Sequence, residues 1–238
     1  MRAELPPQPD PPIGDELICV HHEDGSVEEL RLHDYSRLYS LPGVYEAIVQ
    51  ERLGCRSPAH IAGLLAGAVD AAGWRRGDVR VIDVAAGNGV SGEALAAVGL
   101  APVLGTDIVP AARDAALRDR PGLYGDYRTL DLLALSPENR SSIAQLRANA
   151  LACVACVGDL AGELPTQALA AIVTLLADEA IIAYMHDPRG AEDAAPDVIS
   201  RLGADVRELA RERYLHRHTV NGGRFELDAV VLSVRAQA

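Results

Sequence analysis

The chain has 238 residues and a formal net charge of −12, and apolar residues make up 49% of it. That length allows one sizeable α/β domain with an N-terminal appendage. An acidic chain repels phosphate backbones, so we expect no nucleic-acid partner. All 22 basic residues are arginine, and the absence of lysine excludes a P-loop, a pyridoxal enzyme and the Tyr-x-x-x-Lys pair of many short-chain dehydrogenases.

The N-terminal third divides into a tail and an appendage. Residues 1–12 are rich in proline, so we expect a disordered tail. Residues 13–76 contain two alternating segments around Asp24-Gly25, which predict a hairpin, followed by two helical segments. Ser57 is expected to cap the second of these helices.

From residue 77 to residue 238, apolar strand segments alternate with helical segments. This βαβα order predicts a mostly parallel sheet covered by helices on both faces. The last two strands are joined by Asn221-Gly222-Gly223, a strong hairpin signal, so the chain is expected to end in an antiparallel pair. The predicted fold class is α/β, a doubly wound and mostly parallel seven-stranded sheet with an antiparallel C-terminal hairpin.

Two of the four cysteines, Cys153 and Cys156, form a C-x-x-C pattern within an apolar strand. Residues three apart on a strand face opposite sides, so the two thiols should diverge, and we predict no zinc site. The sequence shows no signal peptide and no apolar segment of membrane length. We therefore expect a cytoplasmic protein with reduced thiols and no membrane partner.

The glycine-rich segment "DVAAGNGVSG", residues 83–92, follows the first strand of the predicted sheet. Glycines in such a loop let backbone N–H groups approach a pyrophosphate, but the carboxylate of Asp83 would oppose phosphate groups. It favours instead a cofactor with a cationic end, such as an ammonium or a sulfonium. Gly92 completes a G-x-G-x-x-G pattern, yet we interpret it as a close-packing residue of the following helix.

The order Asp83-Val-Ala-Ala-Gly87-Asn-Gly89 resembles the D-x-G-x-G-x-G motif of class I S-adenosylmethionine-dependent methyltransferases. Ala85 stands where the first glycine usually falls, and alanine would be strained there at a positive φ. The resemblance covers residues 78 to 235 and implies a Rossmann-like methyltransferase fold. It implies S-adenosylmethionine as cofactor, with S-adenosylhomocysteine as product. The cofactor-binding residues would be Asp83, Ala85, Gly87, Asn88, Gly89, Asp107, Ile108, Asp131, Leu132 and Gly158.

Two later carboxylates support this interpretation. Asp107 ends the second strand, where a carboxylate can accept hydrogen bonds from ribose hydroxyls, as it would equally in an NAD site. Asp131 ends the third predicted strand. The resemblance places it near the adenine amino group, with the Leu132 backbone near the ring.

The resemblance also implies methyl transfer by in-line displacement, which needs mainly proximity and alignment. A base is needed only when the acceptor arrives protonated. His186 beside Asp187 is the preferred base, and a capping or solvent-exposed histidine is the alternative. Asp159 is the second catalytic candidate, to contact an amine or hydroxyl of the substrate, and a helix cap is its alternative.

The acceptor is expected to be a small molecule methylated on oxygen or nitrogen rather than carbon. The N/D-P-P-Y motif of enzymes that methylate bases or glutamine is absent, because "VGDL" takes its place. Bacterial enzymes of this size often modify secondary metabolites, an analogy at the level of the fold.

Two further clusters stay open. Tyr35, Tyr39 and Tyr45 could stack on substrate or cofactor, or pack within the appendage. His216 and His218 alternate along one strand, and we interpret them as surface residues rather than metal ligands.

Two rival functions are kept. One is a nicotinamide-dependent oxidoreductase, and the other is a non-methylating relative that only binds S-adenosylmethionine. Whether the chain forms a homodimer is also left open.

Overall fold

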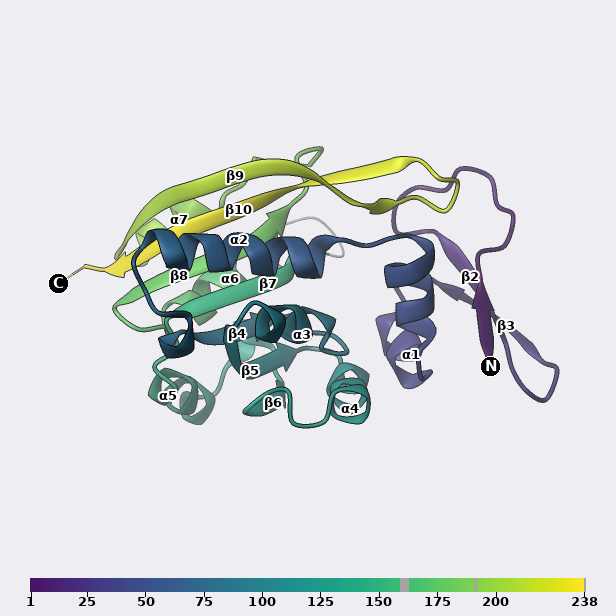
Figure 1. Ribbon diagram of the computed structural model, residues 1–238, viewed down its shortest axis with the longest axis horizontal. Helices are drawn as coiled ribbons and strands as arrows, with labels where there is room; N and C mark the ends of the chain where they lie inside the picture. The colour runs from purple at the N-terminus through teal and green to yellow at the C-terminus, as the bar shows by residue number, and fades with distance from the viewer. Residues whose placement is uncertain (159–162, 191, 238) are drawn as a thin grey trace.

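The computed structural model describes residues 1–158, 163–190 and 192–237, which form a large and a small sheet (Figure 1). The strands of the large sheet lie in the order β6 (Asp126–Thr129), β5 (Ala101–Asp107), β4 (Arg80–Val84), β7 (Ala150–Cys156), β8 (Glu179–His186), β10 (Arg224–Ala236) and β9 (Ala204–His218). The pairs from β6 to β8 are parallel, and those of β10 with β8 and β9 are antiparallel. The predicted fold class is confirmed.

Helices cover both faces of this sheet. One face carries α2 (Ser57–Ala71), α3 (Val90–Ala97) and α4 (Pro110–Asp119), and the other carries α5 (Pro137–Gln145), α6 (Thr166–Val173) and α7 (Ala195–Arg201). Alternation along β4 explains the two layers, since Val81 packs toward α2 while Ile82 and Val84 pack toward α5 and α6. Cys153 and Cys156 likewise pack on opposite faces, as predicted.

The small sheet consists of β1 (Arg2–Glu4), β2 (Leu17–His21) and β3 (Val27–Arg31), all antiparallel. The predicted hairpin is confirmed as β2 and β3. The expectation of a disordered tail over residues 1–12 is wrong, because β1 pairs with the free edge of β2. The side chain of Gln8 also bonds both the N–H and the carbonyl of Leu17, at 2.9 and 3.0 Å, which ties down the proline-rich stretch.

A short helix α1 (Tyr35–Ser40) and a π-helix η1 (Glu46–Arg52) connect this sheet to α2. The linker between η1 and α2 pairs with the end of β9, because His218 N–H donates to Leu53 O at 2.7 Å and Arg56 N–H donates to His216 O at 2.8 Å. Glu16 and Arg217 add an ion pair in which both side chains are buried. Residues 1–56, which we call the N-terminal segment, are therefore joined to the C-terminal hairpin.

Ser57 does not cap α2 as predicted. Its hydroxyl bonds the Tyr214 hydroxyl at 2.6 Å and His216 Nδ1 at 2.5 Å, so it serves a contact between α2 and β9. The reason is tertiary: Ser57 is fully buried, and two polar side chains of β9 reach it there.

Within the described part of the chain, no helix is both long enough and apolar enough to cross a membrane.

Candidate functional site

The loop between β4 and α3 is held in a left-handed backbone conformation at three positions. Ala85, Gly87 and Gly89 have φ of +53°, +55° and +92°. Glycine adopts such angles freely, whereas an alanine there costs about 1–2 kcal/mol. Ala85 is therefore strained, as the sequence suggested it would be if that position had a positive φ.

Two tyrosines near β6 support this loop from beneath. Tyr127 donates from its hydroxyl to Gly87 O at 2.6 Å, and Tyr124 packs edge-to-face on it. Glycines make room for both rings. A Cβ at Gly92 would overlap the Tyr124 hydroxyl, and one at Gly105 would lie 2.7 Å from Cδ2 of Tyr127. The interpretation of Gly92 as a close-packing residue is confirmed.

Asp83 lies under the loop with no exposed surface. Its Oδ2 accepts hydrogen bonds from Ser91 Oγ at 2.6 Å and Tyr124 Oη at 2.7 Å, and Oδ1 has no partner within the described residues. Burial raises the pKa of this carboxyl to about 7, against the opposing effect of the two hydroxyls. In this arrangement Asp83 organises the loop through Ser91 and Tyr124, and its expected contact with the cofactor stays a prediction.

Asp107, at the end of β5, is half-buried and faces the loop. Its Oδ2 accepts from Gly87 N–H and its Oδ1 from Val109 N–H, both at 2.9 Å. Burial raises the pKa of this carboxyl although these backbone bonds oppose it. Each carboxylate oxygen has two lone pairs, so both oxygens keep an acceptor position for a ligand hydroxyl.

Asp131 lies two residues beyond the end of β6 rather than at its end. It is exposed, and its Oδ1 accepts from Leu133 N–H at 2.9 Å, which caps the short helix η3 (Leu132–Ala134). The side chain of Leu132 is in the core, while Ile108 is 65% exposed.

Three tyrosines of the N-terminal segment pack together, and one of them, Tyr39, contacts the loop. Tyr39 lies with its ring centroid 5.8 Å from that of Tyr35 and 5.1 Å from that of Tyr45. A Cβ on Gly87 would overlap the Tyr39 hydroxyl, so this side chain rests on the loop. Burial raises the pKa of Tyr35 to about 12, so that phenol stays protonated at neutral pH.

His186 is buried at the end of β8, with its Nδ1 3.4 Å from Val157 O. A carbonyl can only accept, so Nδ1 carries the proton in this contact and Nε2 is left as an acceptor. Asp187 does not orient this ring, because its carboxylate bonds the Arg189 guanidinium through both oxygens.

The two other predicted site residues, Gly158 and Asp159, follow β7 in the sequence. Gly158 lies two residues beyond the end of β7, and an added Cβ there would overlap the Glu163 carboxylate. Asp159, the second catalytic candidate, lies outside the described residues.

Sequence reasoning missed a polar cluster at the end of β9. The sequence predicts His216 to be a surface residue, and this prediction is wrong, because His216 lies at a β-bulge and its ring bonds the buried Ser57. Burial lowers the pKa of His216 to about 3, so the ring stays neutral. Its Nδ1 also lies 3.9 Å from Cys55 Sγ. A one-residue bulge leaves no signal in strand alternation, so this cluster could not be found from spacing.

In the three described ranges, no group of three or more His, Cys, Asp or Glu side chains is arranged to hold a metal ion.

No protein-family model matches the sequence, and a comparison with curated proteins finds no match. The fold, by contrast, is shared with many solved structures. The strand order, the loop after β4 and the antiparallel hairpin define the class I S-adenosylmethionine-dependent methyltransferase fold.

Three solved structures illustrate this similarity. Magnesium protoporphyrin IX methyltransferase from Synechocystis, with bound S-adenosylmethionine, has a TM-score of 0.50 and 16% identity over 76% of this chain and 80% of its own. TYW2 from Pyrococcus horikoshii, in complex with MeSAdo, has a TM-score of 0.52 and 17% identity over 93% and 72%. The [4+2]-cyclase SpnF has a TM-score of 0.51 and 13% identity over 76% and 81%. At these identities the similarity establishes the fold alone.

Proposed function

We propose that the chain is an S-adenosylmethionine-dependent methyltransferase that acts on an oxygen or nitrogen atom of a small molecule. The observation that carries this proposal is Asp107, a half-buried carboxylate held by the N–H groups of Gly87 and Val109 beside a left-handed glycine loop. A desolvated carboxylate with spare lone pairs is suited to two adjacent ribose hydroxyls. The bound sulfonium cofactor would supply an activated methyl group.

The chain's own residues would then bind the cofactor and align its methyl group with the acceptor. Asp107 would hold the ribose beside the glycine-rich loop. Since displacement of a sulfonium needs mainly alignment, the fold need supply no strong base. For a hydroxyl acceptor, Nε2 of His186 is the candidate to accept the proton.

Calorimetric titration with S-adenosylhomocysteine tests the cofactor assignment. Asp107→Ala should weaken binding by roughly 1.5–3 kcal/mol, the scale for hydrogen bonds to a charged group. Asp107→Asn keeps the shape of the side chain but loses its charge. Its affinity for S-adenosylhomocysteine should lie between those of the unmodified protein and Asp107→Ala. An unchanged dissociation constant in Asp107→Ala would remove the ribose assignment. A fluorescence titration with NADH tests the nicotinamide alternative, and a signal there without one for S-adenosylhomocysteine would favour it.

A second function is kept because one structural neighbour is described as a [4+2]-cyclase, not a methyltransferase. In that case the chain would bind S-adenosylmethionine without transferring its methyl group. Incubation with cofactor carrying a labelled methyl group and a broad panel of phenols, alcohols and amines separates the two. Label that moves to an acceptor supports methyl transfer, and label that stays on a tightly bound cofactor supports the second function.

A further inference from the structure

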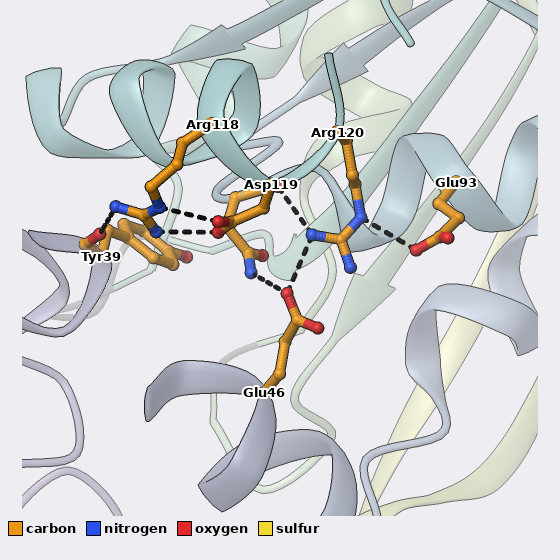
Figure 2. Close-up of polar contacts among 7 residues, drawn as sticks. Tyr39, Glu46, Glu93, Arg118, Asp119 and Arg120 are labelled. Carbon is orange, nitrogen blue, oxygen red and sulfur yellow. Dashed lines mark hydrogen bonds and ion pairs between the residues drawn. The ribbon is translucent and has the colours of Figure 1, made fainter. Parts of the chain in front are cut away.

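A network of charged side chains joins α4 to the N-terminal segment and to the glycine-rich loop (Figure 2). Nη1 of Arg120 donates to Glu46 Oε1 at 2.9 Å and to Asn88 O at 3.1 Å. Nδ2 of Asn88 donates to the same Glu46 oxygen at 2.8 Å. We call these three contacts the latch, because they join η1, the loop and the end of α4 at one point.

Neighbouring contacts reinforce the latch. Nε of Arg120 donates to Glu93 Oε2 at 2.8 Å, which fixes the guanidinium from α3. Nη1 of Arg118 donates to the backbone carbonyl of Tyr39 at 3.3 Å, and its Nε and Nη2 donate to the Asp119 carboxylate (Figure 2). Residues 35–52 are therefore held at both α1 and η1.

The setting of the latch makes it stronger than an ordinary surface ion pair. The Arg120 side chain is 11% exposed and that of Glu46 is 35% exposed. Ion pairs that are exposed to water contribute little to stability. A partly desolvated guanidinium that donates to several acceptors is held more strongly. The Arg120 stem also packs on the loop, since its Cδ would lie 3.1 Å from a Cβ on Gly89.

The latch holds the N-terminal segment over the residues proposed to bind the cofactor. Tyr39, from α1, rests on Gly87, and Gly87 N–H in turn donates to Asp107. A ligand that contacts the loop at Gly87 must therefore displace the Tyr39 side chain. Covering segments of this kind commonly set the rates of ligand binding and release.

We propose that Arg120 is a positioning residue: through Glu46 and Asn88 it latches residues 35–52 over the glycine-rich loop, and opening of this latch limits how fast S-adenosylmethionine binds and leaves. The inference rests on the proposed function for the identity of the ligand. The latch itself rests only on the contacts above.

Surface plasmon resonance with S-adenosylhomocysteine tests the effect on rates. Glu46→Ala removes the shared acceptor and should raise the dissociation rate about tenfold, equivalent to a barrier lower by about 1.4 kcal/mol. Glu46→Gln keeps the size and an acceptor oxygen, and Arg120→Lys keeps the charge without the planar guanidinium. The dissociation rates of both variants should lie between those of the unmodified protein and Glu46→Ala. Raising the salt concentration should accelerate dissociation from the unmodified protein more than from Glu46→Ala.

The matched control is Asp70→Asn, which breaks the exposed Arg76–Asp70 pair at the far end of α2. It should leave both rates unchanged. Equal rates in Glu46→Ala and the unmodified protein would overturn the proposal.

Hydrogen exchange without any ligand tests the latch separately. Backbone amides of residues 46–52 should exchange faster in Glu46→Ala than in Asp70→Asn. Unchanged exchange would overturn the latch, and faster exchange with unchanged dissociation would overturn its control of the rates. If the unmodified protein binds no S-adenosylhomocysteine, the proposed function and the rate claim both fail, while the exchange result still decides whether the latch exists.

Discussion

The hydroxyl of Tyr127 donates a hydrogen bond to the carbonyl oxygen of Gly87 at 2.6 Å. This contact joins β6 to the glycine-rich loop, and both groups are shielded from water. The loop conformation thus depends on a residue 40 positions further along the chain.

Replacing this donor should loosen the loop. Tyr127→Phe leaves the Gly87 carbonyl without a partner, which should lower the free energy of unfolding by about 1–3 kcal/mol and also weaken S-adenosylhomocysteine binding. Urea denaturation and calorimetric titration measure the two effects. Tyr184→Phe is the control, because it removes a hydroxyl that donates to Asp193 on the other face of the sheet. Equal ligand affinities in the two variants would contradict a role for Tyr127 in the loop.

Relief of backbone strain should stabilise the protein. Ala85→Gly removes an alanine at a φ of +53°, a strain of about 1–2 kcal/mol, against a cost of about 0.5–1 kcal/mol for the freedom of glycine in the unfolded chain. We expect the unfolding free energy to rise by roughly 0.5–1 kcal/mol in urea denaturation. Ala86→Gly, at a buried neighbour without a positive φ, should instead lower it. A loss of stability in both variants would refute the strain at Ala85.

The buried carboxyl of Asp83 should make stability depend on pH. Its pKa is about 7 in the folded protein and near 3.8 when unfolded. The folded state therefore binds the proton more tightly, so this contribution is complete below about pH 4 and is lost as the pH rises through about 7. The change can reach about 4 kcal/mol.

Asp83→Asn tests this dependence, because an amide oxygen can still accept from Ser91 and Tyr124 but does not titrate. Thermal melts between pH 4 and pH 8 should show a steeper loss of stability in the unmodified protein than in the variant. Parallel profiles would show that Asp83 is ionised in the folded state throughout.

The buried ion pair of Glu16 and Arg217 should fasten the small sheet to the hairpin. Its side chains are 1% and 3% exposed, and Nη1 donates to Oε1 at 3.0 Å. Glu16→Ala leaves a buried guanidinium unpaired and should cost about 3–5 kcal/mol in urea denaturation. The double variant Glu16→Leu, Arg217→Met should recover much of this loss. A double variant less stable than Glu16→Ala would show that packing, not charge, dominates here.

Much of the large sheet was predictable, because its pattern is local. Continuous apolar strands alternate with helices. Asn221-Gly222 favours a tight hairpin turn whatever the surrounding fold. Helix α7 was not predicted: its seven residues carry too short a pattern to stand out. Asp131 was assigned to a strand that in fact ends two residues earlier, since strand ends depend on the neighbouring strand.

The site was predictable only in part. Asp107 could be found because the carboxyl ends of parallel strands meet at one edge, so a carboxylate after each strand is a local signal with a known place. The contacts of Ser57, His216 and Asp83 could not be predicted, for one shared reason. Each has its partners on an element distant in the chain, and burial, not residue type, decides its role.

The sequence by itself determined most of the order of strands and helices in the large sheet, the glycine-rich loop and the carboxylate that ends β5, because periodicity and turn chemistry act over a few residues. Only the tertiary structure decided that tyrosines support this loop, that Asp83 lies beneath it and that Arg120 latches the N-terminal segment above it. Those contacts join residues up to 74 positions apart, and their energies come from burial and geometry that no local pattern encodes.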